Sequence, residues 1–399
     1  MRVIAVGNGL AGTIFAKTLR ELDSAVEIAI FSDEKHLYYP RPNLIGFLGG
    51  TISLEKVFAF PESWYREKNI GIYLGKPVQR IFPDSGEIEC GGKREKYDAL
   101  LLAAGSRAFV PPFNGADKRG VFSLRTLDDA LSIIEWIEHN KRVTVIGGGL
   151  LGLEIARAVK TRGADVDVVE FFDRLLPRQL DAQGAVVLKK QIEAMGIKVH
   201  LGLATEEIMG KDRVQGIRFK GGKELKTDMA VVAVGIRANI SIASEAGIKT
   251  DKGVVVDDFL QSSHPGIFAA GDIVQHRGTL YGIIPASFDQ ARVAAHNVLG
   301  EKKKYEGTVP SNSLKVMGID VMSVGMVNPE ENTAEEFRKE AKEEGVYRKL
   351  VIQDGIAVGA IWIGTKRNAA EVMRVVSQKI NVGKWKESML EDDFDFSVL

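Results

Sequence analysis

The stretch that decides the fold is residues 3–16, VIAVGNGLAGTIFA. Its apolar beginning predicts a β-strand, its Gly-x-Gly-x-x-Gly centre predicts a tight turn, and its end predicts an α-helix. In this pattern Gly7 permits the turn, Gly9 lets the backbone approach a pyrophosphate, and Gly12 lets the helix pack closely on the strand. The free N–H groups and the positive dipole end of the helix would then face the phosphates. The stretch therefore predicts a dinucleotide-binding unit at the start of the chain.

The same pattern occurs a second time at residues 143–152, VTVIGGGLLG. A glycine turn without a ligand is the alternative for either copy, but each copy has the strand, the glycines and the helix in the required order. Two copies predict two bound dinucleotides. The fingerprint residues expected to bind them are Gly7, Gly9, Leu10, Ala11 and Gly12 in the first unit and Gly147, Gly149, Leu150, Leu151 and Gly152 in the second.

Charge and composition exclude several classes of protein. The 399 residues include 53 Lys and Arg and 53 Asp and Glu, so the chain has no overall field for nucleic acid or an acidic membrane. The length predicts two or three domains, and the sequence contains neither a signal-peptide pattern nor an apolar run of membrane-spanning length. A single cysteine excludes internal disulfides and favours a reducing, cytoplasmic location, and six scattered histidines predict no metal site.

The ends of the second strands carry the residues expected at the adenosine riboses. In the first unit the strand at 26–31 ends at Ser32, where an acid is usual, so Asp33 or Glu34 would have to reach the ribose instead. In the second unit the strand at 166–169 ends at Glu170. Its carboxylate would accept hydrogen bonds from both ribose hydroxyls and would repel a 2′-phosphate, so it favours NADH over NADPH. The positive charge of Arg174 nearby would weaken this preference.

Further apolar strands end in small residues, where a ligand can approach the backbone. The segment 97–106 ends at Ala104 and Gly105, and the segment 229–235 repeats this ending at Gly235, which supports an internal duplication. The segment 267–272 delivers Gly271 and Asp272, whose carboxylate could accept hydrogen bonds from a chain of hydroxyls. A helix predicted over 286–299 would begin near Ser287 and Phe288 and point N–H groups at an anionic ring edge.

The remaining segments predict smaller elements. The loop at 38–44 contains Arg41 and Pro42 and is stiffened by two prolines, which suits either a functional loop or a surface turn. The acidic, aromatic residues 391–396 predict a frayed tail, with a docking peptide as the alternative. The other expected elements are a meander of strands at 72–74, 78–82 and 87–90 containing Cys90 as a packing residue, a helix at 128–139, a hairpin at 214–225, a hairpin at 347–363 around Asp354-Gly355, and an amphipathic helix at 368–379.

With these motifs the sequence resembles the pyridine nucleotide-disulfide oxidoreductase superfamily over residues 1–305. Within it, the chain is most similar to NAD(P)H:rubredoxin oxidoreductases and to the FAD- and NAD-binding N-terminal part of the NADH nitrite reductase large subunit. The residues that carry the resemblance are Tyr39-Pro40-Arg41-Pro42, Leu124-Arg125-Thr126, Gly147 to Glu154 and Ile267 to Asp272, with Leu175-Leu176-Pro177-Arg178 and Leu180-Asp181 closest to the nitrite reductase branch.

The resemblance implies an α/β fold with two Rossmann-like dinucleotide-binding domains of the glutathione reductase-like type and a small α+β C-terminal domain. The implied domains are FAD-binding at 1–111 and 241–305, NAD(H)-binding at 112–240, and C-terminal at 306–399. It also implies that Asp272 binds the ribityl chain of FAD and that Ser287 lies near the pyrimidine edge of the flavin. Arg41 would lie near flavin N5 and form an ion pair with Glu154, and these two residues are the expected catalytic pair.

The absence of a redox cysteine pair sets the expected chemistry. Disulfide reductases of this superfamily carry two cysteines facing the flavin and its peroxidases carry one, whereas this chain has Cys90 alone, far from either position. The expected function is therefore transfer of electrons from NADH through FAD to a one-electron acceptor protein, such as rubredoxin or a redox partner subunit, with the C-terminal region packed over the flavin side. The alternatives are an NADH oxidase that reduces oxygen and a redox-sensing flavoprotein without turnover; a homodimer is left open.

Overall fold

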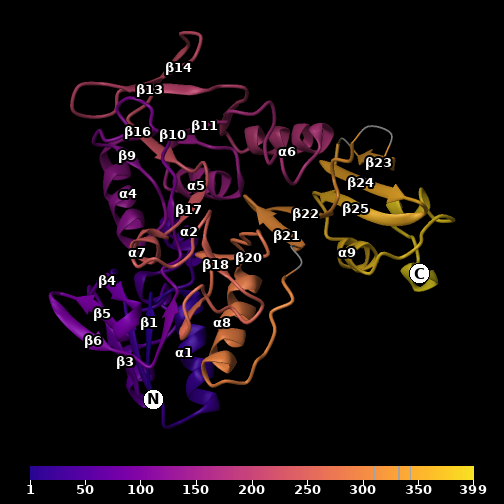
Figure 1. The fold of residues 1–399 in the computed structure, drawn as a ribbon. Helices are drawn as coiled ribbons and strands as arrows, with labels where there is room; N and C mark the ends of the chain where they lie inside the picture. The colour runs from indigo at the N-terminus through magenta and orange to yellow at the C-terminus, as the bar shows by residue number, and fades with distance from the viewer. Residues whose placement is uncertain (309–310, 331–332, 342) are drawn as a thin grey trace.

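The computed structural model describes residues 1–308, 311–330, 333–341 and 343–399, with residues 311–315 described by their backbone alone (Figure 1). Two parallel sheets form the body of the molecule, one at the lower left and one above it, and an antiparallel sheet near the C-terminus lies to the right (Figure 1). This mixed α/β architecture confirms the predicted fold class. Within the described ranges, no helix combines the length and the apolar character needed to cross a bilayer.

The first sheet has the strand order β19-β7-β1-β2-β3, and all of its neighbouring strands are parallel. Its strands are β1 (Arg2–Val6), β2 (Glu27–Phe31), β3 (Ile70–Tyr73), β7 (Ala99–Leu102) and β19 (Ile267–Ala269). Helix α1 (Leu10–Leu22) packs against α8 (Ile284–Val298), although the two lie far apart in the sequence. The late segment 267–298 thus returns to the sheet that the N-terminus begins.

The second sheet repeats this arrangement with the order β12-β11-β10-β16-β9, again parallel throughout. Its strands are β9 (Val121–Phe122), β10 (Arg142–Ile146), β11 (Asp165–Val169), β12 (Lys198–His200) and β16 (Met229–Val232), and its helices are α4 (Leu127–His139), α5 (Leu150–Thr161) and α6 (Ala182–Ala194). The central strands are buried because they are apolar on both faces, as parallel strands covered by helices require.

Short helices and small sheets connect the two units or extend from them. They are α2 (Asn43–Leu48), α3 (Glu62–Glu67), α7 (Ser241–Glu245), the sheet β4-β5-β6 (Val78–Phe82, Glu87–Cys90, Lys93–Lys96), the sheet β13-β14-β15 (Thr205–Met209, Gly216–Phe219, Glu224–Lys226), and the ribbons β8-β17 (Ser106–Ala108, Ile236–Ala238) and β18-β20 (Val254–Val256, Val274–His276). The short 3-10 turns are η1 (Leu54–Lys56) and η2 (Pro83–Ser85).

The predicted meander was wrong in its first strand. Residues 72–74 do not join β4 and β5, because β3 pairs in parallel with β2 at the edge of the first sheet. The side chains explain this: Ile70 is buried, and the rings of Phe31 and Tyr73 stack with centroids 4.6 Å apart. The third meander strand is instead β6, a run of charged residues whose sequence has no apolar signal.

The C-terminal region is a five-stranded antiparallel sheet with one helix. Its strands follow the order β21-β22-β25-β24-β23 and comprise β21 (Ser311–Val316), β22 (Ile319–Gly325), β23 (Glu335–Ala341), β24 (Val346–Gln353) and β25 (Ile356–Ile363), followed by α9 (Ala369–Ser377), η3 (Ser388–Leu390) and η4 (Phe396–Val398). The hairpin predicted around Asp354-Gly355 is β24-β25, and the predicted amphipathic helix is α9. The sheet packs against α6, and β21 contacts α5.

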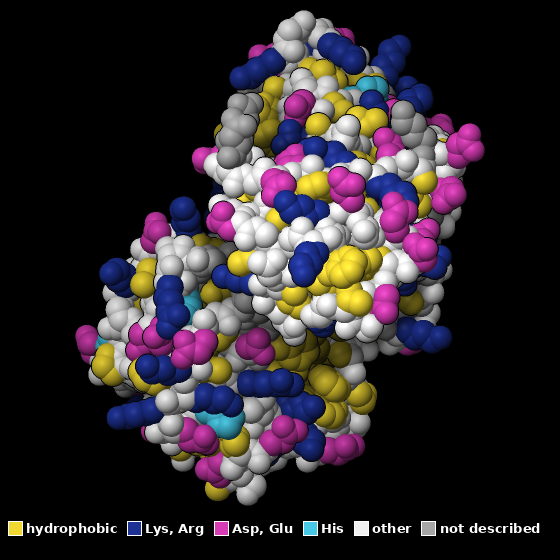
Figure 2. Space-filling view, turned by 90° about the vertical axis from the view of Figure 1, so that its right-hand side faces the viewer, with side chains coloured by type: hydrophobic (Ala, Val, Ile, Leu, Met, Phe, Trp, Pro, Cys, Tyr) yellow, Lys and Arg dark blue, Asp and Glu magenta, His cyan; other side chains and the backbone are white. Residues whose placement is uncertain are grey.

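The final residues are packed on the C-terminal sheet and helix, so the expectation of a frayed tail was wrong. Phe396 and Leu390 are buried, and the rings of Phe394 and Phe396 meet edge to face with centroids 4.8 Å apart. The buried side chain of Arg348 donates to Leu390 O at 2.5 Å and contacts Asp392. Figure 2, which views the C-terminal domain side, shows hydrophobic side chains among charges of both signs on this face.

Candidate functional site

A cavity of about 970 Å³ extends along the carboxyl ends of the first sheet. Ligands of open parallel sheets bind at this edge, because the strand ends and the following loops converge there. Most of the residues predicted to bind FAD line it, namely Gly7, Gly9, Leu10, Ala11, Ser32, Glu34, Arg41, Pro42, Ala104, Gly105, Gly271, Asp272, Ser287 and Phe288. From the second fingerprint, Leu150 and Leu151 reach the same cavity. The structure therefore brings the start of α5 to the predicted FAD half of the chain.

The two fingerprints have the same local geometry. Gly7 N donates to Phe31 O and Gly147 N donates to Val169 O, each at 2.7 Å. A Cβ atom built on Gly12 or on Gly152 would lie 1.9 Å from the carbonyl oxygen of the first fingerprint glycine, so both helices need glycine for their close approach. Around Gly9 and Gly149 the same test finds no atom within 4 Å, which leaves open space beside each helix N-terminus.

Glu170 is held against the second fingerprint. Its Oε2 accepts from Gly148 N at 2.6 Å and its Oε1 accepts from Phe172 N at 2.9 Å. It is buried and lies outside the large cavity, as do Gly147, Gly149 and Gly152, which sit at the carboxyl end of the second sheet. Gly235 follows β16 at a φ of +121°, and its carbonyl accepts from Phe109 N at 2.9 Å.

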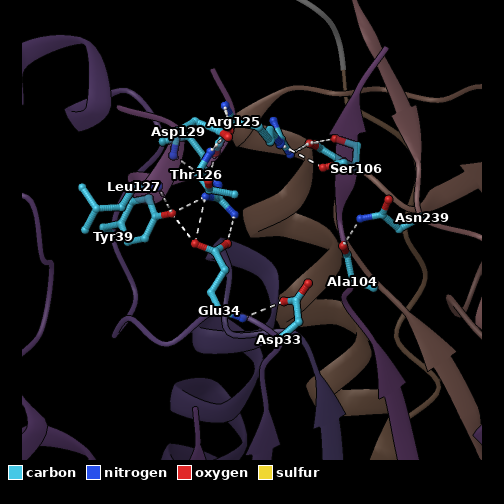
Figure 3. Close-up of polar contacts among 12 residues, drawn as sticks. Asp33, Glu34, Tyr39, Ala104, Ser106, Arg125, Thr126, Leu127, Asp129 and Asn239 are labelled. Carbon is cyan, nitrogen blue, oxygen red and sulfur yellow. Dashed lines mark hydrogen bonds and ion pairs between the residues drawn. The ribbon is translucent and has the colours of Figure 1, made fainter. Parts of the chain in front are cut away.

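Arg41 is fixed by Glu34, so the expected ion pair with Glu154 is not formed. The Arg41 Nη2 atom lies 2.5 Å from Glu34 Oε1, and Arg41 Nη1 donates to Arg125 O at 2.8 Å. Tyr39 donates to Glu34, and Figure 3 shows the Glu34 carboxylate directed at that hydroxyl. Burial raises the pKa of Tyr39 well above its ordinary value, so the phenol stays protonated as a donor. Arg41 is therefore held beside Glu34, the acid predicted for the ribose of FAD.

Glu154 has a partner from the C-terminal sheet. Its Oε1 accepts from Met317 N at 2.6 Å, and Met317 sits buried in the turn between β21 and β22 with a φ of +55°. The expected pair is absent because Glu34 binds the guanidinium of Arg41, although α2, which follows the loop containing Arg41, does contact α5. The contact of Glu154 with Met317 brings the C-terminal sheet to α5, whose first residues, Leu150 and Leu151, line the cavity, although none of the residues described after Phe288 lines it.

Arg125 is a site residue to which the sequence analysis assigned no role. Its Nη2 donates to Asp272 Oδ2 at 2.7 Å and its Nε donates to Ser106 O at 2.9 Å, so it bridges the strand ends of β7 and β19. Ser106 Oγ also donates to Asp272 Oδ2 at 2.9 Å. Among the residues that the structure describes, none donates to Asp272 Oδ1, so this oxygen is available to accept from a ligand hydroxyl. One feature of the sequence could have pointed to Arg125, namely its position immediately before Thr126, the residue that caps α4. Thr126 and Asp129 form a capping box, and Asp129 also accepts from the backbone N–H of Arg125, which holds the arginine in place (Figure 3).

The start of α8 differs from the predicted position. The helix begins at Ile284, with Pro285 in its first turn, so Ser287 N already donates to Ile283 O at 3.2 Å. The free N–H groups of this helix therefore belong to residues before Ser287. Ser287 and Phe288 still line the cavity.

The cavity residues offer the donors and charges that FAD requires. Asn8 Nδ2 is buried with no hydrogen-bond partner in the part of the chain that the structure describes, and Asn8 lines the cavity beside Gly9. The first turn of α1 contains no acidic residue and offers free N–H groups. Arg41 and Arg125 add two cations, which suit a pyrophosphate. These residues would hold the phosphates, while Asp272 would hold hydroxyls farther along the cofactor.

Replacing Arg41 with alanine is expected to weaken FAD binding by about tenfold or more, since a hydrogen bond to a charged group contributes roughly 1.5–3 kcal/mol. The loss also leaves Glu34 unpaired at the cavity wall, where its charge repels phosphate. Flavin fluorescence during titration of the apoprotein measures the dissociation constant. The variant Arg41→Lys, which keeps a positive charge beside Glu34, should lose less affinity than Arg41→Ala, and an unchanged affinity in Arg41→Ala would contradict the assignment.

Comparisons with known proteins agree with this geometry. Residues 1–297 match the pyridine nucleotide-disulphide oxidoreductase family, and residues 310–380 match the rubredoxin NAD+ reductase C-terminal domain. A nitrite reductase [NAD(P)H] of Bacillus subtilis is 35% identical over 96% of this chain and 48% of its own length, and an NADH oxidase of Methanocaldococcus jannaschii is 35% identical over 82% of this chain and 76% of its own length. The chain spans about half the length of the nitrite and nitrate reductase relatives that it matches.

The fold also matches solved structures. The ferredoxin reductase of Rhodopseudomonas palustris superposes with a TM-score of 0.89 at 26% identity, covering 100% of this chain and 99% of that one. The family match covers most of the chain and includes both fingerprints. The chain therefore belongs to the pyridine nucleotide-disulphide oxidoreductase family.

Proposed function

We propose that the chain is an NADH-dependent FAD reductase that passes electrons to a one-electron carrier protein, either rubredoxin-like or a redox partner subunit. The observation that carries the proposal is that Leu150 and Leu151, from the start of the second fingerprint helix, line the same cavity as the predicted FAD residues. An arrangement of this kind holds the two cofactors in contact, which turns a bimolecular step into an intramolecular one. With one cysteine in the chain, we place the reaction in the reducing cytoplasm.

FAD, when bound, supplies the ability to take two electrons from NADH and to release them singly. The residues of the chain bind and orient it. We assign its pyrophosphate to the start of α1 with Arg41 and Arg125, its adenosine ribose to Glu34, and its ribityl chain to Asp272 Oδ1. In the second unit we assign the NADH pyrophosphate to Gly149 and its ribose to Glu170.

The position of Cys90 supports a reaction in which electrons leave the flavin without passing through a thiol. Cys90 lies in β5, is buried, and is outside the residues that line the cavity. Burial raises the pKa of its thiol, which disfavours the reactive thiolate. Electrons would therefore leave the site directly for an external acceptor. A carrier protein is supported as that acceptor by the match of residues 310–380 to the rubredoxin NAD+ reductase C-terminal domain.

An anaerobic titration tests the proposal. NADH is added to the purified holoprotein, and oxidised rubredoxin follows. We expect the flavin absorbance to bleach with NADH and to return as rubredoxin is reduced. Failure of NADH to bleach the flavin would contradict the NADH assignment. Bleaching without reduction of rubredoxin would contradict a rubredoxin-like acceptor and direct the search to a partner subunit.

A control with oxygen distinguishes the proposed carrier reductase from the second candidate, an NADH oxidase. The relative in Methanocaldococcus jannaschii is an NADH oxidase, so transfer to oxygen is the alternative that the comparisons favour. Under the main proposal, aerobic NADH consumption without a carrier should be much slower than with rubredoxin. Equal rates with and without the carrier would favour the oxidase.

A further inference from the structure

Helix α2 links the predicted FAD-binding half of the chain to the core of the second unit. It follows the loop that contains Arg41 and Pro42, and both of these residues line the cavity together with Ile45 of the helix. In the same helix, Leu44 and Leu48 are buried in the hydrophobic cluster that also contains residues of α5 and of the second sheet. The position of α2 on α5 therefore affects how the wall of the cavity lies against the second unit.

The two helices approach closely at the end of α2. A Cβ atom built on Gly49, the residue that follows the helix, would lie 3.5 Å from the Cα atom and 3.6 Å from the Cβ atom of Ala158 on α5. Because one residue is glycine and the other is alanine, no longer side chain separates the two backbones there. The other end of α5 carries Leu150 and Leu151, which line the same cavity. A change in the contact between α2 and α5 would therefore move the second fingerprint relative to the cavity.

Arg162 binds the end of α2 from the end of α5. It directly follows the last residue of α5, and its Nη2 donates to Phe47 O at 3.1 Å while its Nε donates to Leu48 O. The last carbonyls of a helix lack partners within the helix and form the negative end of its dipole, so a guanidinium is a favourable partner for them. Because the guanidinium is a rigid fork, donors on two neighbouring carbonyls fix the direction of α2 as well as its distance.

We propose that Arg162 is a positioning residue for the reduction of FAD by NADH, because it holds α2 on α5 and so sets how closely the second unit approaches the FAD cavity. This inference rests on the proposed function, in which each unit binds one cofactor. Arg162 is outside the residues that line the cavity, so it acts through the two helices and not on a cofactor. A misplacement of about 1 Å between reacting groups can slow a reaction about a hundredfold. Loss of Arg162 should therefore lower the rate of flavin reduction without weakening the binding of either cofactor.

The variant Arg162→Ala tests the inference in the holoprotein, because binding and rate can be measured separately. ADP-ribose contains the adenosine and pyrophosphate of NADH but no nicotinamide, so its calorimetric Kd should stay at the wild-type value. The limiting rate of flavin reduction at saturating NADH, measured anaerobically by stopped flow, should fall about tenfold or more. Hydrogen–deuterium exchange of peptides from α2 should become faster, and this measurement reports on the contact between the helices without any turnover.

Two further variants serve as controls. Arg162→Lys keeps the positive charge at the end of α2 but lacks the fork, so it should recover part of the rate and part of the protection from exchange. Lys160→Ala removes a cation from the last turn of the same helix. The ammonium group of Lys160 donates to no residue that the structure describes, so this variant should match the wild type in rate, Kd and exchange.

A wild-type limiting rate in Arg162→Ala would overturn the inference, as would a loss of rate that Lys160→Ala shares or that a weaker binding of ADP-ribose explains. If Arg162→Ala does not retain FAD, Arg162→Lys decides: a slower rate with an unchanged Kd supports the inference, and a wild-type rate overturns it. If NADH fails to reduce the wild-type flavin, the proposed function fails, whereas the exchange of α2 still decides whether Arg162 holds the two units together.

Discussion

Replacing Gly149 with valine is expected to leave the protein yellow but to stop NADH from bleaching it. Gly149 has a φ of −79°, which any residue adopts, and no atom lies within 4 Å of a Cβ built there. The fold therefore has room for the side chain. The valine would instead fill the space that the NADH pyrophosphate needs beside the N-terminus of α5. Because several charge-assisted hydrogen bonds would be lost together, we expect a roughly hundredfold loss of NADH affinity.

The matched variant is Gly9→Val in the first unit, where the geometry is the same. Gly9 has a φ of −83° and no atom within 4 Å of a built Cβ. This variant should fold but purify without flavin, so its absorbance near the flavin band should be lost. Circular dichroism controls for folding in both variants. Normal flavin content in Gly9→Val, or normal bleaching of Gly149→Val by NADH, would show that the two fingerprints do not bind the cofactors as assigned.

The second large effect concerns Asp181, which joins the second unit to the C-terminal sheet. Asp181 caps α6 by accepting from Gly184 N at 2.9 Å, and its Oδ2 accepts from Tyr347 OH at 2.7 Å. Lys349 Nζ lies 3.3 Å from the same oxygen and 3.0 Å from Glu336 Oε1, and the Tyr347 and Lys349 side chains are fully buried. The carboxylate is therefore the polar centre of the interface between α6 and β24.

Asp181→Ala is expected to destabilise this interface by about 3 kcal/mol, because it leaves a buried lysine with one of its two acidic partners missing and removes a helix cap. Hydrogen–deuterium exchange of peptides from α6 and β24 measures the effect locally, which suits a chain with several domains. The control is Gln191→Ala, which removes a single bond between the same two regions, to Gly345 O at 2.8 Å, and should change protection by less than about 1.5 kcal/mol. Equal effects of the two variants would contradict the central role of Asp181.

The same carboxylate gives the interface a pH dependence with a defined sign. Burial alone would raise the pKa of Asp181, but the bonds from Tyr347, Gly184 and Lys349 outweigh it and hold the pKa below its ordinary value. A carboxyl group with a lowered folded-state pKa stabilises the fold above the unfolded-state pKa of about 3.9, and this contribution is lost as the pH falls through the folded-state pKa. The difference in protection between wild type and Asp181→Asn should therefore be constant near neutral pH and narrow below about pH 4.

The parts of the fold that were predicted correctly have local signals. The fingerprint glycines, the apolar strands and the Asp354-Gly355 turn are each encoded within about ten consecutive residues, and the structure forms each of them. The positions of Asp272 and Glu34 on the cavity wall follow from strand ends in the same way. Strand β6 escaped prediction because its side chains are charged and mostly exposed, so no alternating apolar pattern marks it.

The sequence by itself determined the two dinucleotide units, their order and the absence of a cysteine pair, because glycine spacing and residue identity depend only on neighbours along the chain. Only the tertiary structure decided which charges pair. Arg41 Nη1 meets the backbone of Arg125, 84 residues away, and Asp181 meets Tyr347, 166 residues away. The packing of the last residues and the placement of the C-terminal sheet on α6 were decided in the same way. Such contacts depend on how separate elements pack together. The sequence around either residue does not indicate which distant residue it will contact.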